Sequence, residues 1–261
     1  MKTILYLALL APLLLWSQSI DQNYVLSRNY KQASATIIPN PSIQQAATSI
    51  TYFDGLGRAI QQVSVDQSAE GKSIVVPMEY DVYGRMAIEY LPYASELGGG
   101  NYRPDALTEV LGYADYNGEP PYSEKLLESS PLNRVLKQSA PGESWAMGSG
   151  HEIRLDYQAN SGSDNIIRYT ASATWNAAHS IYDVSLSQGS YATGDLYKTV
   201  TKDENWTSGK NNTSEEYKDK EGRVVLKRTY NDSDPHDTYY VYDQFGNLSY
   251  VIPPESSSPT V

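Results

Sequence analysis

Cysteine is absent from the 261-residue chain, and phenylalanine occurs only twice beside 23 tyrosines. The lack of cysteine excludes disulfide bonds and a lipid-anchored cysteine from the mature protein. A thick, dry core favours Phe, Leu and Ile, because a buried phenol must find a hydrogen-bond partner. The surplus of tyrosine therefore indicates a thin β-sheet wall with water on at least one side.

Positive charge is also scarce, with 20 Lys and Arg against 31 Asp and Glu and a formal net charge of −11. Proteins bind nucleic acids and anionic membranes through a basic face that neutralises phosphates. The acidic balance argues against both partners. An acidic surface that keeps an exported protein soluble explains this balance.

Long apolar runs are confined to the start of the chain. Lys2 and the apolar stretch 4–16 precede Ser17-Gln18-Ser19, which is the pattern of a secretory signal peptide with small residues for cleavage. The run is too short to span a bilayer, and no later stretch is apolar enough to do so. We expect a signal peptide at 1–19, no transmembrane span, and a secreted or cell-surface protein.

One short pattern recurs four times after this leader. A tyrosine precedes an aspartate, glycine follows the aspartate by three positions, and arginine or, once, asparagine comes next. An Asp carboxylate accepts a backbone N–H two residues on, and glycine supplies the positive φ that a hairpin loop needs near its exit. Each copy therefore predicts a β-hairpin turn with a structural role. The predicted turn residues are Asp54, Gly57 and Arg58; Asp81, Gly84 and Arg85; Asp219, Gly222 and Arg223; and Asp243, Gly246 and Asn247.

The copies organise the chain into two parts. Residues 20–200 are expected to form an N-terminal β domain that contains two consecutive hairpins at 49–93, and residues 201–254 the later repeat hairpins. Residues 255–261 are expected to be a linker or a truncated end. The apolar spacing of Leu107, Val110 and Leu111 predicts one short helix near 104–114. The expected fold is mainly β, with antiparallel hairpin repeats in an extended or curved sheet.

Two further segments bear on this organisation. Residues 122–138 look like a degenerate copy in which Asn133 takes the place of glycine, since Asn is the next-best residue for a left-handed conformation. Gly98-Gly99-Gly100 is not followed by the Lys-Ser/Thr of a phosphate-binding loop. It predicts a flexible break.

The four units resemble the YD-repeat, or RHS-repeat, family of secreted bacterial proteins. The blocks 130–135, 141–145 and 219–227 resemble an N-terminal domain of unknown function that precedes such repeats. Members of the family build a long β-sheet that spirals into a hollow shell, often around a C-terminal toxin, and a self-cleaving core region closes it. This sequence contains neither that core nor a toxin, and Asn247 departs from the repeat pattern, so no arginine role is implied there.

The resemblance implies a non-enzymatic wall segment of an exported protein. Its partners would be the remainder of a longer RHS-repeat chain and either an enclosed C-terminal toxin or surface glycans.

Side chains that bear chemistry are dispersed. His151, His179 and His236 lack metal-ligand spacing. Residues 231–237 are dense in oxygen ligands but lack the glycine and distal glutamate of an EF-hand, which favours a solvated hairpin loop over a calcium site. We therefore expect no catalytic residue, no metal and no cofactor.

Two other function classes stay open at this point. Trp145, Trp175 and Trp206 are candidates for a sugar-binding surface, which would make the chain a carbohydrate-binding or adhesive module. A glycoside hydrolase with two carboxylates is a third hypothesis, although no local sequence pattern supports it.

Overall fold

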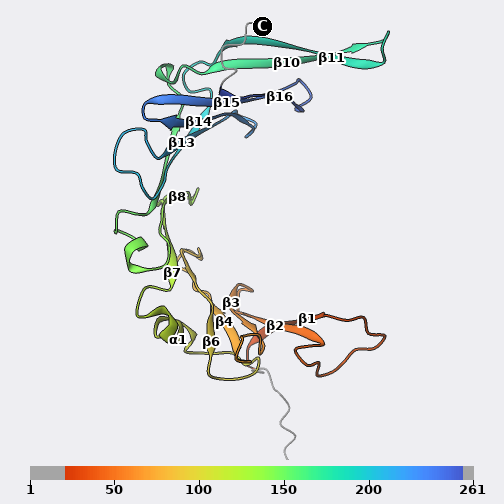
Figure 1. Cartoon of the computed structure of the whole chain (residues 1–261), viewed down its shortest axis with the longest axis vertical. Helices are drawn as coiled ribbons and strands as arrows, with labels where there is room; N and C mark the ends of the chain where they lie inside the picture. The colour runs from red at the N-terminus through yellow and green to blue at the C-terminus, as the bar shows by residue number, and fades with distance from the viewer. Residues whose placement is uncertain (1–20, 255–261) are drawn as a thin grey trace, which may run out of the picture. The chain divides into compact units, whose positions relative to one another are not determined.

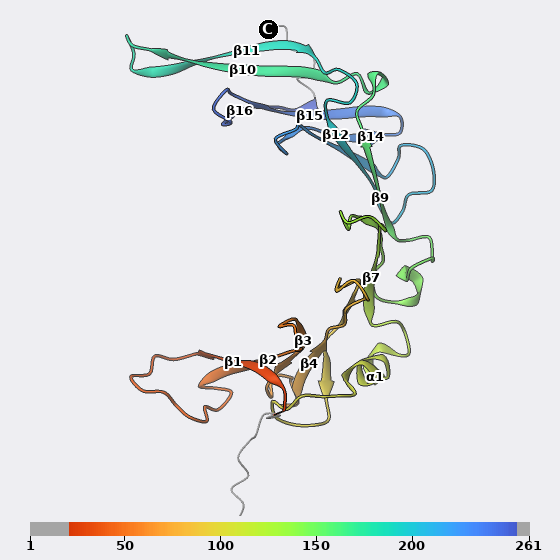
Figure 2. The ribbon, with the colours of Figure 1, turned by 180° about the vertical axis from the view of Figure 1, so that it is seen from behind.

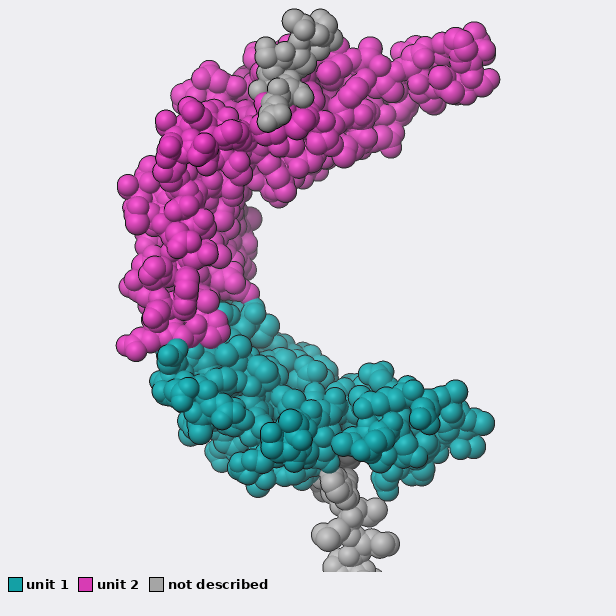
Figure 3. Space-filling model, in the orientation of Figure 1, with its two compact units in different colours: residues 1–123 teal, residues 124–261 magenta. Residues whose placement is uncertain are grey.

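The computed structural model describes residues 21–254, so the expected signal peptide and the expected linker at 255–261 lie outside the described residues. The chain divides into two compact units at residues 123 and 124, coloured separately in Figure 3. The expected domain boundary after residue 200 is based on the positions of the repeats and not on contacts between residues, and it stays a prediction. The prediction of a mainly antiparallel β fold is confirmed.

Unit 1, described from residue 21 to 123, contains a five-stranded antiparallel sheet in the order β1-β2-β3-β4-β6 (Figure 1). Its strands are β1 (Asn23–Tyr30), β2 (Ala46–Phe53), β3 (Ala59–Ser64), β4 (Ser73–Pro77) and β6 (Tyr93–Ser95). β2 and β3 form the first expected hairpin around the turn at Asp54.

The second expected hairpin is less regular. β4 pairs with β3 and β6. The three-residue β5 (Ile88–Tyr90) meets the chain before the turn through a single bridge between Met78 and Glu89. The second copy therefore keeps its turn without a continuous ladder between the segments on either side.

One short helix, α1 (Ala106–Leu111), completes the core of unit 1. Ala106 and Val110 are buried on one helix face with Ile50, Tyr52 and Val63 of the sheet. The helix lies within the predicted range. Of the three apolar residues whose spacing predicts it, Val110 is buried, whereas Leu107 and Leu111 are 37% and 49% exposed. The buried stripe begins one residue earlier, at Ala106.

The glycine-rich segment between β6 and α1 is a packed loop. It surrounds Arg103, which is 1% exposed. The Arg103 guanidinium donates to the carbonyl oxygens of Gly98 and Gly99 at 3.3 and 3.0 Å, and to that of Leu97. The Tyr52 hydroxyl donates to the Gly100 carbonyl at 2.6 Å. The sequence suggested a flexible break, whereas these contacts satisfy the loop's carbonyl groups and hold it against the sheet.

Unit 2, from residue 124 to 254, contains an antiparallel sheet in the order β16-β15-β14-β13-β12-β9-β8-β7. The strands are β7 (Tyr122–Leu127), β8 (Val135–Gln138), β9 (Ile153–Ala159), β12 (Tyr197–Lys202), β13 (Thr213–Lys218), β14 (Val224–Asn231), β15 (Asp234–Tyr242) and β16 (Leu248–Ile252). Because neighbouring strands alternate in direction, the turns that join β7 to β8, β13 to β14 and β15 to β16 lie at one end of this sheet.

A two-stranded ribbon of β10 (Ile167–Asn176) and β11 (Ile181–Ser190) packs on this sheet (Figures 1 and 2). Tyr169 and Ala171 of β10 share a buried cluster with Leu226 and Tyr239. The outer edge of β10 also meets the fourth turn, because the Gln244 carboxamide accepts from Ala173 N–H at 2.9 Å and donates to the Ala173 carbonyl at 2.5 Å. A side chain thus pairs with the ribbon as another strand would.

Candidate functional site

The first repeat turn is closed by its own aspartate. Asp54 Oδ1 accepts the backbone N–H groups of Leu56 and Arg58, both at 2.9 Å, and Asp54 Oδ2 accepts the Arg58 Nε–H at 2.8 Å. Gly57 has a φ of 76°, in the left-handed region that favours glycine. The Arg58 backbone donor is the main reason that the pKa of Asp54 is lowered.

The same arrangement occurs in the other three copies. Each aspartate accepts the N–H groups two and four residues on, and each glycine has a φ between 76° and 83°. In the last copy the Asn247 amide replaces the guanidinium and donates to Asp243 Oδ2 at 3.2 Å. Both oxygens of each carboxylate are therefore engaged within its own turn. The residues concerned are Asp81, Gly84 and Arg85; Asp219, Gly222 and Arg223; and Asp243, Gly246 and Asn247.

Two of the turn arginines also contact the following copy. The Arg58 guanidinium lies 4.4 Å from the ring centroid of Tyr80, and that of Arg223 lies 5.0 Å from the ring centroid of Tyr242. Tyr80 and Tyr242 begin copies two and four, so each contact joins successive repeats. Cation–π contacts at exposed sites contribute about 0.5–1 kcal/mol. The third arginine, Arg85, lies over Tyr83 of its own turn at 5.0 Å.

The degenerate copy closes with a different acid. Asn133 has a φ of 53°, in the glycine position. Glu128, two residues before the four-residue turn 130–133, takes the role of the aspartate and accepts Arg134 Nη2 at 2.7 Å. The hydrogen bond from Arg134 lowers the pKa of Glu128 to about 2. Sequence reasoning missed Glu128 because the repeat spacing places no acid there.

A cluster of buried charges lies on the sheet of unit 2. Lys198 Nζ lies 2.7 Å from Asp164 Oδ1 and 3.2 Å from Glu215 Oε2. Glu215 also accepts Lys210 Nζ and the Tyr217 hydroxyl, both at 2.6 Å. Burial raises the pKa of Asp164, but hydrogen bonds from Lys198 and Ser161 outweigh it and lower the pKa to about 2. The cluster fixes the 3₁₀ turn that ends at Asp164 on the sheet.

The acidic segment 231–237 is a tight hairpin, as the sequence favoured. β14 ends at Asn231 and β15 begins at Asp234. Asp237 is engaged by Arg228 through two hydrogen bonds of 2.6 and 2.8 Å. Within residues 21–254, no three His, Asp or Glu side chains are grouped so that they could hold a metal ion.

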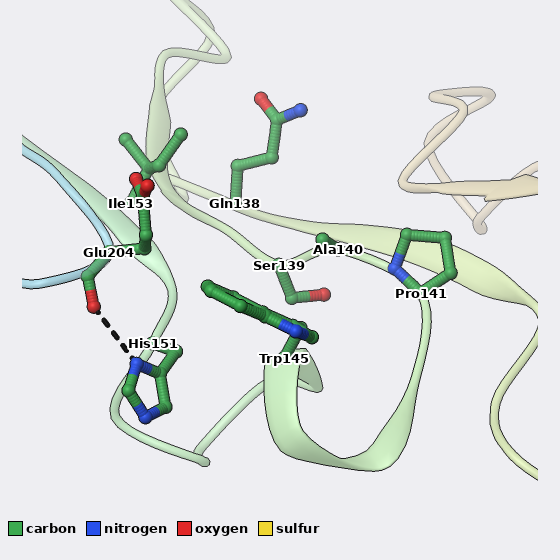
Figure 4. A pocket seen from close by; sticks show the side chains of 8 residues that line it. All are labelled: Gln138, Ser139, Ala140, Pro141, Trp145, His151, Ile153 and Glu204. Atoms are coloured by element: carbon green, nitrogen blue, oxygen red, sulfur yellow. Dashed lines mark hydrogen bonds between the residues drawn. The ribbon is translucent and has the colours of Figure 1, made fainter.

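A cavity of about 440 Å³ lies beside the 3₁₀ turn Glu143–Trp145 in unit 2 (Figure 4). Trp145, which is 41% exposed, lines it, and the His151 ring packs against the indole with centroids 5.2 Å apart. His151 Nδ1 is held 3.1 Å from the Glu204 carbonyl oxygen. The remaining lining residues are Gln138, Ser139, Ala140, Pro141 and Ile153.

The other two candidate tryptophans have different surroundings. Trp175 is 54% exposed and packs edge-on against Tyr182, with ring centroids 5.2 Å apart. Trp206 is covered by Lys202, whose Nζ lies 4.4 Å from its ring centroid, and its indole N–H donates to Gly209 at 3.1 Å. Of these three side chains, Trp145 is the one that lines the described cavity.

Comparisons with known proteins give a family and a fold. A family model described as a domain of unknown function, DUF6443, matches residues 26–159, about half of the chain. No curated protein matches the chain.

Among solved structures, the chain is similar to a chain in the crystal structure of TcdB2-TccC3-TEV, with a TM-score of 0.50 and 16% identity over 98% of this chain and 11% of the other. It is also similar to a chain of the Tc holotoxin pore of Photorhabdus luminescens with a TccC3 mutation, with a TM-score of 0.47 and 14% identity over 90% of this chain and 10% of that one. The chain thus spans about a tenth of the length of these structures, and the first similarity shows a shared fold.

The described residues include no helix with the length and apolar character that a bilayer crossing requires.

Proposed function

The chain belongs to the DUF6443 family, and we propose that it is a non-enzymatic structural segment of an exported RHS- or YD-repeat protein, in which it forms part of a β-sheet wall. The observation that supports this most is the contact between successive repeats. Arg58 is bound within its own turn and lies over Tyr80 of the next, and Arg223 does the same toward Tyr242. A unit that is fixed by its successor suits a wall that grows by repetition.

The state of the turn carboxylates supports the absence of catalysis. A general acid or base needs an oxygen that can reach a substrate. Asp54 and Asp81 use both oxygens for donors inside their own turns. These residues act as turn anchors in the proposal, and so do Asp219 and Asp243.

The same proposal assigns a role to each remaining part of the chain. Residues 1–19 direct export, residues 20–200 form the N-terminal β domain with the first two repeat hairpins, and residues 201–254 are the later repeat hairpins. The partner is the following part of an RHS-repeat chain, and the wall encloses a C-terminal toxin or stands at the cell surface. The fold shared with a chain of the TcdB2-TccC3-TEV structure supports this assignment.

The test compares the chain ending at Val261 with the same chain extended by its downstream reading frame. Among the residues that the structure describes, β16 is the last strand of its sheet and is paired on one side, with β15. If further repeats continue the wall, hydrogen exchange of β16 amides becomes slower in the extended protein, while β14, paired on both sides, is unchanged. Electron microscopy of the extended protein then shows a β-walled particle. Unchanged exchange in β16 and a particle without a wall would overturn the proposal.

A further inference from the structure

We propose that the cavity beside Trp145 binds a neutral sugar residue of a glycan. This inference does not depend on the wall function, because it uses only the shape and the side chains of one site in unit 2. The volume of about 440 Å³ lies within the range of small-molecule sites, roughly 300–1,000 Å³.

The cavity has an apolar side that suits a pyranose ring. Ala140, Pro141 and Ile153 line it together with the Trp145 indole (Figure 4). The face of an indole carries negative potential, and the C–H groups on one face of a pyranose carry positive potential. The contact between His151 and Trp145, with ring centroids 5.2 Å apart, and the bond from His151 to the Glu204 carbonyl hold this platform in place.

The cavity also has polar groups with unused hydrogen-bonding capacity. In the part of the chain that the structure describes, the Gln138 carboxamide, the Glu204 carboxylate and the Trp145 indole N–H make no hydrogen bond to another residue. A carboxamide donates and accepts, a carboxylate accepts, and an indole N–H donates. Each sugar hydroxyl can do both, so the three groups can bind the hydroxyl rim of a ring that lies on the indole.

The charge of the site favours a neutral ligand. No residue that lines the cavity in the described part of the chain is Lys or Arg, and Glu204 is one of the lining residues. A uronic acid or a sugar phosphate would bring a second negative charge close to this carboxylate, which costs free energy at short range. We therefore assign the site to neutral hexoses or N-acetylhexosamines.

The test uses the secreted chain on a glycan array, followed by saturation-transfer NMR and calorimetry with glucose, galactose, N-acetylglucosamine and their disaccharides. The expected result is binding of at least one neutral glycan by the wild-type chain. Trp145→Ala and Gln138→Ala should weaken it by about tenfold or more, the loss typical of a central binding residue. Glu204→Gln should raise the affinity for the matching uronic acid relative to that for the neutral sugar, because the repulsive charge is gone.

Trp175→Ala is the control, since Trp175 is another exposed tryptophan of unit 2, 54% exposed against 41% for Trp145, and packs on Tyr182. It should leave affinity within about twofold of wild type. Trp145→Tyr keeps an aromatic platform, so it should retain measurable binding. This variant distinguishes loss of the platform from a folding defect in Trp145→Ala. The inference is overturned if no neutral sugar binds, or if Trp145→Ala and Trp175→Ala weaken binding equally.

Discussion

Gly100 offers the sharpest test of the packing in unit 1. A Cβ at this position would lie 2.2 Å from Ile50 Cδ1 and 3.3 Å from Val65 Cγ2. Ile50 is 1% exposed, so its methyl group can move only by displacing other core atoms. Overpacking of this kind costs about 1–3 kcal/mol, and we expect Gly100→Ala to lower the free energy of unfolding of unit 1 by that amount.

Gly98 is the matched control in the same loop. A Cβ there would meet nothing within 4 Å, and its φ is not in the left-handed region. Gly98→Ala should be neutral or stabilise by about 0.4–1 kcal/mol through the unfolded chain. Ile50→Val removes the clashing methyl and alone costs about 0.5–1.5 kcal/mol. The double variant Gly100→Ala/Ile50→Val should therefore cost less than the two single changes together.

Hydrogen exchange measured by mass spectrometry reports the stability of unit 1 separately from that of unit 2. Trp145, Trp175 and Trp206 all lie in unit 2, and the fourth tryptophan, Trp16, belongs to the expected signal peptide. In the chain without residues 1–19, tryptophan fluorescence in urea therefore reports unit 2 as an internal reference. In Gly100→Ala, amides of β2 and β3 should exchange about 5 to 150 times faster, which corresponds to 1–3 kcal/mol at 1.4 kcal/mol per factor of ten. Exchange equal to that of Gly98→Ala, or strictly additive costs in the double variant, would refute the predicted clash.

Three further outcomes are expected. Asn133→Gly should be tolerated and Asn133→Ala should cost about 1–2 kcal/mol in urea unfolding, since the position has a φ of 53°; equal effects would contradict this. Asp164 has a folded pKa of about 2, below its ordinary 3.8, so it stabilises unit 2 by up to about 2 kcal/mol above pH 4 and loses this as the pH falls toward 2. Fluorescence-detected unfolding against pH should show this loss, and Lys198→Gln, which removes the partner at 2.7 Å, should flatten it. Gln244→Ala should speed exchange at the Ala173 amide and cost about 1–3 kcal/mol, while unchanged exchange would show that the side-chain pairing contributes nothing.

The turns were predictable from the sequence because their chemistry is local. Asp54 binds N–H groups two and four residues on, and Gly57 lies three residues on, so a short window contains all the partners. The helix was found, but its buried face depends on the sheet below it, which a window around Leu107 does not contain.

The candidate site was only partly predictable because its residues come from distant parts of the chain. Trp145 was predictable as a sugar-binding candidate, whereas Gln138 and Glu204 were not. Gln138 ends β8, and Glu204 follows β12, which lies beside β9. Their meeting at one cavity depends on the order β12-β9-β8, and no local spacing encodes that order. The same holds for Arg103 and Gln61, whose mutual hydrogen bonds join residues 42 positions apart.

The pairing of Gln244 with Ala173 has a consequence for the placement of the β10–β11 ribbon. An antiparallel ribbon that lies on a sheet through apolar side chains can slip by two residues and still bury the same face. Such a slip moves the strand by about 6.8 Å, which is beyond the reach of one carboxamide. The fourth turn therefore helps to select one longitudinal position of the ribbon, together with the hydrogen bonds from Ile167 N–H to the Tyr239 hydroxyl and from the Tyr250 hydroxyl to the Val184 carbonyl. Apolar contacts hold the ribbon on the sheet, and these hydrogen bonds set its alignment.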